Sequence, residues 1–164
     1  MIFVTMGSAP FDFSRLAKKM DEISGVTGEE AIIQLGFTKY KPLYAAYFDF
    51  VPYEKALNYF RAAAIIVGHA SAGPLVYARK FNKPLILVPR NSALGEHVDD
   101  HQIETANAIA GTSGLIEVIY DENKLQSAVQ RALSKVDSGQ KYKEPDTLNS
   151  LILSISDFVE KINV

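Results

Sequence analysis

The stretch AIIVGHASAGPLVYARKFNKPLILVP, residues 64–89, decides the fold of this chain. It contains two short apolar runs, residues 65–67 and 85–88, and each is typical of a strand buried on both faces. Between them lie a turn of small residues, 68–73, and a segment from Pro74 onward with apolar residues at helical spacing. Asn82 suits the left-handed position that ends a helix. We interpret the stretch as two parallel strands joined by a right-handed helical crossover.

Length and composition limit the class of protein. The chain has 164 residues, 48% of them hydrophobic, which is enough for one globular domain with a sizeable core. Its formal net charge of −2 provides no basic field, so we expect no nucleic-acid partner. It has no cysteine, which excludes disulfides and thiolate metal sites. The first residues lack the basic flank of a signal peptide, and no apolar run approaches the length of a membrane span, so we expect a cytoplasmic protein.

Expected strands and helices alternate along the rest of the chain. The further strands are expected at residues 2–6, 31–36, 44–51 and 115–120. The further helices are expected from residues 10–12 to 23 and at 52–63, 98–110 and 123–136. A polar stretch, residues 137–146, is expected to form a loop or linker before a C-terminal helix, 147–162. This order predicts an α/β fold, a Rossmann-like open parallel sheet with helices on both faces, in one domain of residues 1–164.

Glycines follow three of the expected strands. They are Gly7, Gly36 and Gly68, and the carboxyl ends of parallel strands meet at one edge of the sheet, where ligands of such folds bind. The turn 68–73 precedes a helix, whose free N–H groups and dipole can hold an anion, phosphate above all. The sequence therefore predicts an anion site at this edge.

Three segments of the sequence, one of them the turn described above, point to a family. They are MIFVTMGS at residues 1–8, the turn 68–73, and VPR at 88–90 followed by EHVDDHQ at 96–102, the last being the most specific. Together they resemble the donor-binding, C-terminal half of glycosyltransferase family 28 over roughly residues 1–119. Its most similar members by pattern are free-standing halves. These are the catalytic subunit of the UDP-N-acetylglucosamine transferase of dolichol-linked oligosaccharide synthesis and bacterial exopolysaccharide transferase subunits.

The resemblance implies a function for the chain. It implies one half of a GT-B glycosyltransferase that transfers a sugar from a UDP-sugar, with UDP-N-acetylhexosamine as the expected donor, to a lipid-linked acceptor. Inversion at the anomeric carbon, no metal and no other cofactor are implied as well. The acceptor would be bound by a separate membrane-anchored subunit. That partner would hold the chain at the cytoplasmic face of the membrane and would be needed for activity.

The resemblance also implies a set of substrate-binding residues. The turn amides would stabilise the diphosphate of the leaving UDP, and Asp100 and Gln102 would contact the donor sugar. The full set is Gly7, Ser8, His69, Ala70, Ser71, Ala72, Gly73, Arg90, Glu96, Asp100, His101 and Gln102. His69 is the one candidate for a catalytic role, and a histidine held by backbone at a strand end is the equal alternative. We expect the catalytic base on the partner or between the two halves.

Three positions depart from the family pattern. The family usually has glycine in place of Ser71, serine or threonine in place of Pro74, and in many members a ribose-binding glutamate in place of Tyr77. Proline removes both an amide and a hydroxyl, and tyrosine offers a single hydroxyl. Two alternatives therefore stay open: a non-catalytic subunit that activates or anchors a transferase, and an unrelated nucleotide-binding module such as a flavodoxin-like domain.

Two other patterns have a structural and a functional interpretation. His97 and His101 would share a helical face near Asp100, as metal ligands do. A polar helix start, with acids near the positive end of the dipole, is the favoured interpretation, and no metal ligand is assigned. The aromatic run in residues 40–53 is interpreted as a strand packed on both faces in preference to a partner or acceptor surface.

Overall fold

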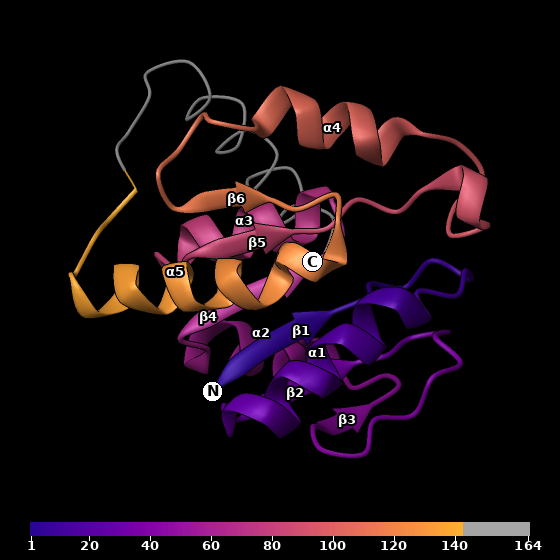
Figure 1. The fold of residues 1–164 in the computed structure, drawn as a ribbon, viewed down its shortest axis with the longest axis horizontal. Helices are drawn as coiled ribbons and strands as arrows, with labels where there is room; N and C mark the ends of the chain where they lie inside the picture. The colour runs from indigo at the N-terminus through magenta and orange to yellow at the C-terminus, as the bar shows by residue number, and fades with distance from the viewer. Residues whose placement is uncertain (143–164) are drawn as a thin grey trace.

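The computed structural model describes residues 1–142 of the chain (Figure 1). Within them, six strands form one parallel sheet in the order β3–β2–β1–β4–β5–β6. The strands are β1 (Ile2–Thr5), β2 (Ala31–Gln34), β3 (Ala46–Phe48), β4 (Ile65–Gly68), β5 (Leu85–Leu87) and β6 (Ile116–Val118). The order confirms the predicted Rossmann-like open sheet, including the crossover from β4 to β5.

Helices cover both faces of the sheet, as predicted (Figure 1). The helices are α1 (Ser14–Thr27), α2 (Tyr53–Ala62), α3 (Ala72–Lys80), α4 (His101–Ile109) and α5 (Leu125–Asp137), with short 3₁₀ turns η1 (Ser92–Leu94) and η2 (Glu122–Lys124). Helices α1 and α5 pack on one face, against alternate residues such as Ile65 and Val67. Helices α2, α3 and α4 pack on the other, against Phe3 and Ile66. Because both faces are covered, β1 and β4 are buried along their whole length.

Helix α1 differs from its expected bounds at both ends. It begins at Ser14 and continues through Gly25 to a left-handed cap at Gly28 with φ of +72°. A Cβ at position 25 would lie 2.7 Å from the Tyr44 ring, so this glycine serves close packing. Helix α1 therefore extends past its expected end at residue 23, to Thr27.

The strand expected at residues 44–51 is much shorter. The buried Asp21 carboxylate accepts the backbone N–H groups of Leu43, Tyr44 and Ala45 at 2.8 Å each, which holds this segment as a loop on α1. Only Ala46–Phe48 pairs with β2, at the edge of the sheet.

The aromatic run is not packed on both faces, so that interpretation is wrong. Tyr44 is 68% exposed, Tyr47 46% and Phe50 50%. Phe48 packs inward instead, stacked on Tyr59 with ring centroids 5.0 Å apart. An edge strand of three residues lets one aromatic side chain reach the core and leaves its neighbours outside.

The remaining differences concern helix ends. Helix α3 begins at Ala72, so Pro74 is its third residue and not its first. Helix α4 begins at His101, later than the expected residue 98, and the 3₁₀ turn η1 before it is capped by the Asn91 side chain. The left-handed residue after α3 is Asn82, with φ of 52°, as predicted.

The last described segment follows α5. This helix extends to Asp137, and Tyr142 then contacts the β4–β5 crossover, with its hydroxyl donating to the Lys83 carbonyl at 3.0 Å. The expected helix 147–162 lies outside the described residues. No helix within residues 1–142 has the length and apolar character needed to cross a membrane.

Candidate functional site

The predicted glycine-rich edge forms where the strand order reverses. From β1 the chain adds β2 and β3 on one side of the sheet, and from β4 it adds β5 and β6 on the other side. A ligand crevice is therefore expected between the carboxyl ends of β1 and β4. Gly7 and His69 lie there in contact. A Cβ on Gly7 (φ +75°) would lie 2.5 Å from His69 Cε1, and one on Gly36 would lie 2.5 Å from the Gly7 carbonyl oxygen. Close approach of three loops therefore requires glycine at positions 7 and 36.

His69 is buried at this junction, with 9% of its surface exposed. Its Nε2 lies 2.7 Å from Ser71 Oγ, and its Nδ1 lies 3.4 Å from the Thr5 carbonyl oxygen. Burial, together with the nearby positive charge of Arg90, lowers the pKa of His69 to about 4. The imidazole is therefore neutral at physiological pH, and both of its nitrogens already have protein partners.

The N-terminus of α3 faces the same junction. Ser71 is its N-cap residue, but the described contacts give it no side-chain cap, because its hydroxyl turns to His69. The amides of Ala72 and Gly73 belong to the first helical turn, which has no carbonyl partners of its own. Pro74 has no N–H and packs close to Gly68, where a Cβ would lie 3.1 Å from its Cγ. Two amides and the positive end of the helix are thus available to an anion.

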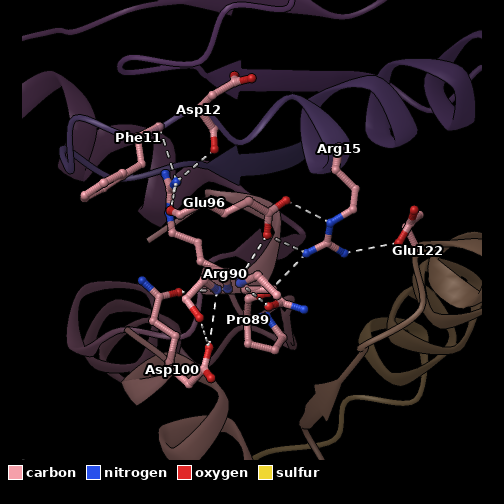
Figure 2. Close-up of polar contacts among 12 residues, drawn as sticks. Phe11, Asp12, Arg15, Pro89, Arg90, Glu96, Asp100 and Glu122 are labelled. Atoms are coloured by element: carbon pink, nitrogen blue, oxygen red, sulfur yellow. Dashed lines mark hydrogen bonds and ion pairs between the residues drawn. The ribbon is translucent and has the colours of Figure 1, made fainter. Parts of the chain in front are cut away.

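Arg90 connects the β1–α1 loop to the segment that leads into α4 (Figure 2). Its side chain is 1% exposed and lies over the Phe13 ring, 4.6 Å from the centroid. The guanidinium donates to backbone carbonyls of Met6 (2.8 Å), Phe11 (3.2 Å) and Glu96 (3.0 Å). Its Nε has no partner among the described residues. Arg90 thereby fixes the loop that contains Gly7 and Ser8.

Glu96 belongs to a second, adjacent network. Its carboxylate accepts two hydrogen bonds from Arg15, each 2.9 Å long, and one from the Asn91 N–H at 3.0 Å. Figure 2 shows Arg15 between Glu96 and Glu122, which it contacts at 3.1 Å. The charged groups of Arg90 and Glu96 thus contact protein atoms, and donor contact by either residue stays a prediction.

The start of α4 carries the other predicted residues. Asp100 is exposed, and its Oδ1 accepts from the Ser92 hydroxyl at 2.6 Å. Gln102 is 2% exposed, and its Oε1 accepts the Arg90 N–H at 3.1 Å. The exposed His101 bonds Asp99 through Nδ1. Asp100 and His101 can therefore meet a ligand, whereas Gln102 positions the segment.

The structure adds residues that the sequence patterns did not single out. Arg15 is 81 positions from Glu96 and 107 positions from Glu122, so no local spacing in the sequence indicates these contacts. With five other residues, Arg15 and Glu122 line a cavity of about 160 Å³ at the carboxyl ends of β5 and β6, beside the predicted site. Tyr53 is also new, and its hydroxyl lies 2.9 Å from the Tyr77 hydroxyl. Tyr77 is the residue that stands where the family pattern often has glutamate.

Comparison with known proteins supports the fold. CalG4, the calicheamicin glycosyltransferase, shares it with a TM-score of 0.58 and 17% identity over 81% of this chain and 33% of that one. The glycotransferase of kitacinnamycin shares it with a TM-score of 0.59 and 16% identity over 84% of this chain and 37% of that one. The chain thus spans about a third of the length of these enzymes.

Sequence comparison identifies the family. No curated protein matches the chain. Residues 1–162 match the glycosyltransferase family 28 C-terminal domain, nearly the whole sequence. The chain therefore belongs to the glycosyltransferase family 28 C-terminal domain family, as the motifs at residues 1–8, 68–73, 88–90 and 96–102 predicted.

Proposed function

We propose that the chain is the donor-binding half of a two-subunit GT-B glycosyltransferase. It binds a UDP-sugar, UDP-N-acetylhexosamine, and a membrane-anchored partner subunit at the cytoplasmic face of the membrane supplies the lipid-linked acceptor. One observation carries the proposal: at the reversal of strand order, His69 lies against Gly7 and bonds Ser71, the N-cap of α3, so the first-turn amides of Ala72 and Gly73 begin beside this junction. This is where a diphosphate binds in sheets of this topology.

The proposed reaction is a single displacement with inversion. An acceptor hydroxyl oxygen attacks the anomeric carbon, the bond from that carbon to the β-phosphate oxygen breaks, and its electron pair leaves with UDP. Negative charge then grows on the diphosphate, where the amides of Ala72 and Gly73 and the α3 dipole stabilise it without a metal. The acceptor proton passes to a general base.

The state of His69 supports a base outside this chain. A group with a pKa of about 4 is a weak proton acceptor at neutral pH, and its Nε2 is engaged by Ser71. We therefore assign His69 to holding the Ser71 hydroxyl away from the first turn of α3, which leaves the amides of Ala72 and Gly73 to the diphosphate. The base then belongs to the partner subunit or to the crevice between the subunits.

The donor sugar is assigned to the start of α4. The exposed Asp100 carboxylate accepts hydrogen bonds from sugar hydroxyls, and the exposed His101 lies next to it. Gln102 and Arg90 hold this segment in place through the 3.1 Å bond between them.

Calorimetric titration with UDP and UDP-N-acetylglucosamine tests the proposal. Wild type should bind both, and Gly7→Ala should not, because the new Cβ displaces His69 at the junction. Gly28→Ala is the matched control: its φ of +72° brings the same backbone strain, with no atom within 4 Å of a Cβ. Failure of wild type to bind either nucleotide, or equal binding by Gly7→Ala, would contradict the proposal.

A second titration distinguishes the alternatives. Pro74, which removes one first-turn amide, favours a non-catalytic subunit, and such a subunit binds neither UDP nor a UDP-sugar. Binding of flavin or adenine nucleotide without UDP binding would identify an unrelated module. Full transferase activity of the purified chain alone on a lipid-linked acceptor would refute the need for a partner.

A further inference from the structure

Two of the three histidines of the chain lie on either side of Asp99: His97 is on the loop before α4, and His101 is the first residue of that helix. His97 Nδ1 is 3.2 Å from Asp99 Oδ1, and His101 Nδ1 bonds the same oxygen. The two imidazole rings are nearly perpendicular, at 83°, with centroids 4.5 Å apart. One nitrogen or oxygen from each of the three residues lies within 4.8 Å of the others. Three side chains of the kind that bind transition metals thus converge on one point.

The cluster is partly fixed before any ligand binds. The His97 ring packs on Phe11 with centroids 5.3 Å apart, and its side chain is only 12% exposed. Asp99 and His101 have side chains 58% and 51% exposed, so an ion can reach them from solvent. Asp100, which the sequence placed beside the two histidines, is directed to Ser92 instead. Asp99 is therefore the carboxylate available to the cluster.

We propose that His97, Asp99 and His101 form a binding site for a divalent transition-metal ion, with Zn²⁺ the best fit. Two imidazole nitrogens and one carboxylate oxygen are an ordinary zinc ligand set. At metal–ligand distances of about 2.0–2.2 Å, tetrahedral ligands lie roughly 3.3 Å apart. The separation between His97 Nδ1 and Asp99 Oδ1 is 3.2 Å, close to this value, and His101 Nδ1 contacts the same oxygen. Each ring binds through an unprotonated Nδ1, with its proton on Nε2.

The ion joins two parts of the proposed donor site. His97 is held by the β1–α1 loop through Phe11, and His101 is the first residue of α4. A metal between them braces the segment that contains Asp100 and Gln102. The transfer step proposed above uses no metal, so this ion is structural. The site does not depend on nucleotide binding.

Titration of the chain, freed of any affinity tag, with ZnCl₂ in a chelator-free buffer tests this site. Calorimetry should show one Zn²⁺ per chain, and Co²⁺ in its place should give the visible absorption bands of tetrahedral coordination. Asp99→Ala and His101→Ala should each weaken Zn²⁺ binding by more than about tenfold, because each removes a ligand and even the loss of an outer partner of a ligand costs about that much. Glu104→Gln, an exposed change in the first turn of α4, is the matched control and should bind as wild type does.

The variants at Asp99 and His101 alter exposed side chains, so thermal unfolding without metal should match wild type. Absence of Zn²⁺ binding in wild type, or unchanged binding in both variants, would overturn the site. A chain that binds Zn²⁺ but no UDP or UDP-sugar would refute the proposed function and leave the metal site standing.

Discussion

Ser71 Oγ lies 2.7 Å from His69 Nε2, so the N-cap hydroxyl of α3 points to the end of β4 and not to its own helix. The side-chain oxygen of an N-cap serine usually accepts a hydrogen bond from a backbone N–H group in the first turn of its helix. Here the histidine holds the hydroxyl aside. The amides that a cap would occupy stay available at the junction with Gly7, which is why this turn is the centre of the proposed site.

Burial of His69 predicts a pH dependence of stability. Its pKa is about 4 when folded and near 6.5 when unfolded, so between these values the unfolded chain binds more protons. The free energy of unfolding should therefore fall as pH decreases from 6.5 to 4, by about 3 kcal/mol over the full window. Urea unfolding across this range measures it. His69→Gln should lose this part of the slope, and an unchanged slope in the variant would contradict the prediction.

Pro74 predicts a gain in nucleotide affinity on substitution. Pro74→Ala restores an amide in the first turn of α3, and a hydrogen bond from an amide to a charged phosphate contributes about 1.5 kcal/mol or more. UDP should bind about tenfold more tightly, measured by calorimetry. Leu75→Ala, one position further along the helix, adds no amide and serves as the control. Equal or weaker UDP binding by Pro74→Ala would show that position 74 does not face the diphosphate.

Arg90 predicts a large loss of stability when it is replaced. Arg90→Met leaves the buried carbonyl oxygens of Met6 and Glu96, and the partly buried one of Phe11, without this donor, which should cost about 3 kcal/mol or more in denaturant unfolding. Arg131→Gln is the control, because its pair with Glu117 is on the surface, and it should change stability by less than about 1 kcal/mol. Similar losses in both variants would contradict the assigned role of Arg90.

Because the pKa of Asp21 is lowered, we expect a second pH dependence of stability, at more acidic pH than that of His69. Burial alone would raise its pKa, but hydrogen bonds from the Leu43 and Ala45 amides outweigh burial and lower it. The stability it provides is therefore present above pH 3.8 and is lost as pH falls below that value. Asp21→Asn places an amide donor opposite backbone donors and should cost about 2 kcal/mol at pH 7. Asp49→Asn, in the exposed pair with Lys41, should cost little, and hydrogen exchange of residues 43–45 should rise only in Asp21→Asn.

The sheet was largely predictable because its central strands are continuous apolar runs. Strands buried on both faces need such runs, and residues 65–67 and 85–88 show them. The edge strand β3 was not predictable in the same way. The start of β3 is set by Asp21, whose carboxylate accepts hydrogen bonds from the backbone N–H groups just before the strand. Most of its neighbouring aromatic side chains are exposed, which an aromatic-rich sequence does not reveal.

The site was predictable where it depends on local sequence. Gly7, the turn 69–73 and the α3 N-terminus meet as expected, since each follows a strand of known direction. The contacts of Arg90 and Glu96 were not predictable, because their partners are 84 and 81 positions away. The sequence also could not decide which acid faces His97 and His101, because the helix begins later than its pattern indicated.

The central place of β1 has a consequence for how the protein folds. This first strand pairs with β4, about sixty residues later, and its end is bonded by Arg90 across 84 positions. Contacts between residues so distant along the chain are slow to form, so we expect folding in milliseconds to seconds. The proposed nucleotide crevice then assembles late, after Arg90 has emerged from the ribosome, and until β4 has emerged the apolar edge of β1 that pairs with it is exposed to aggregation.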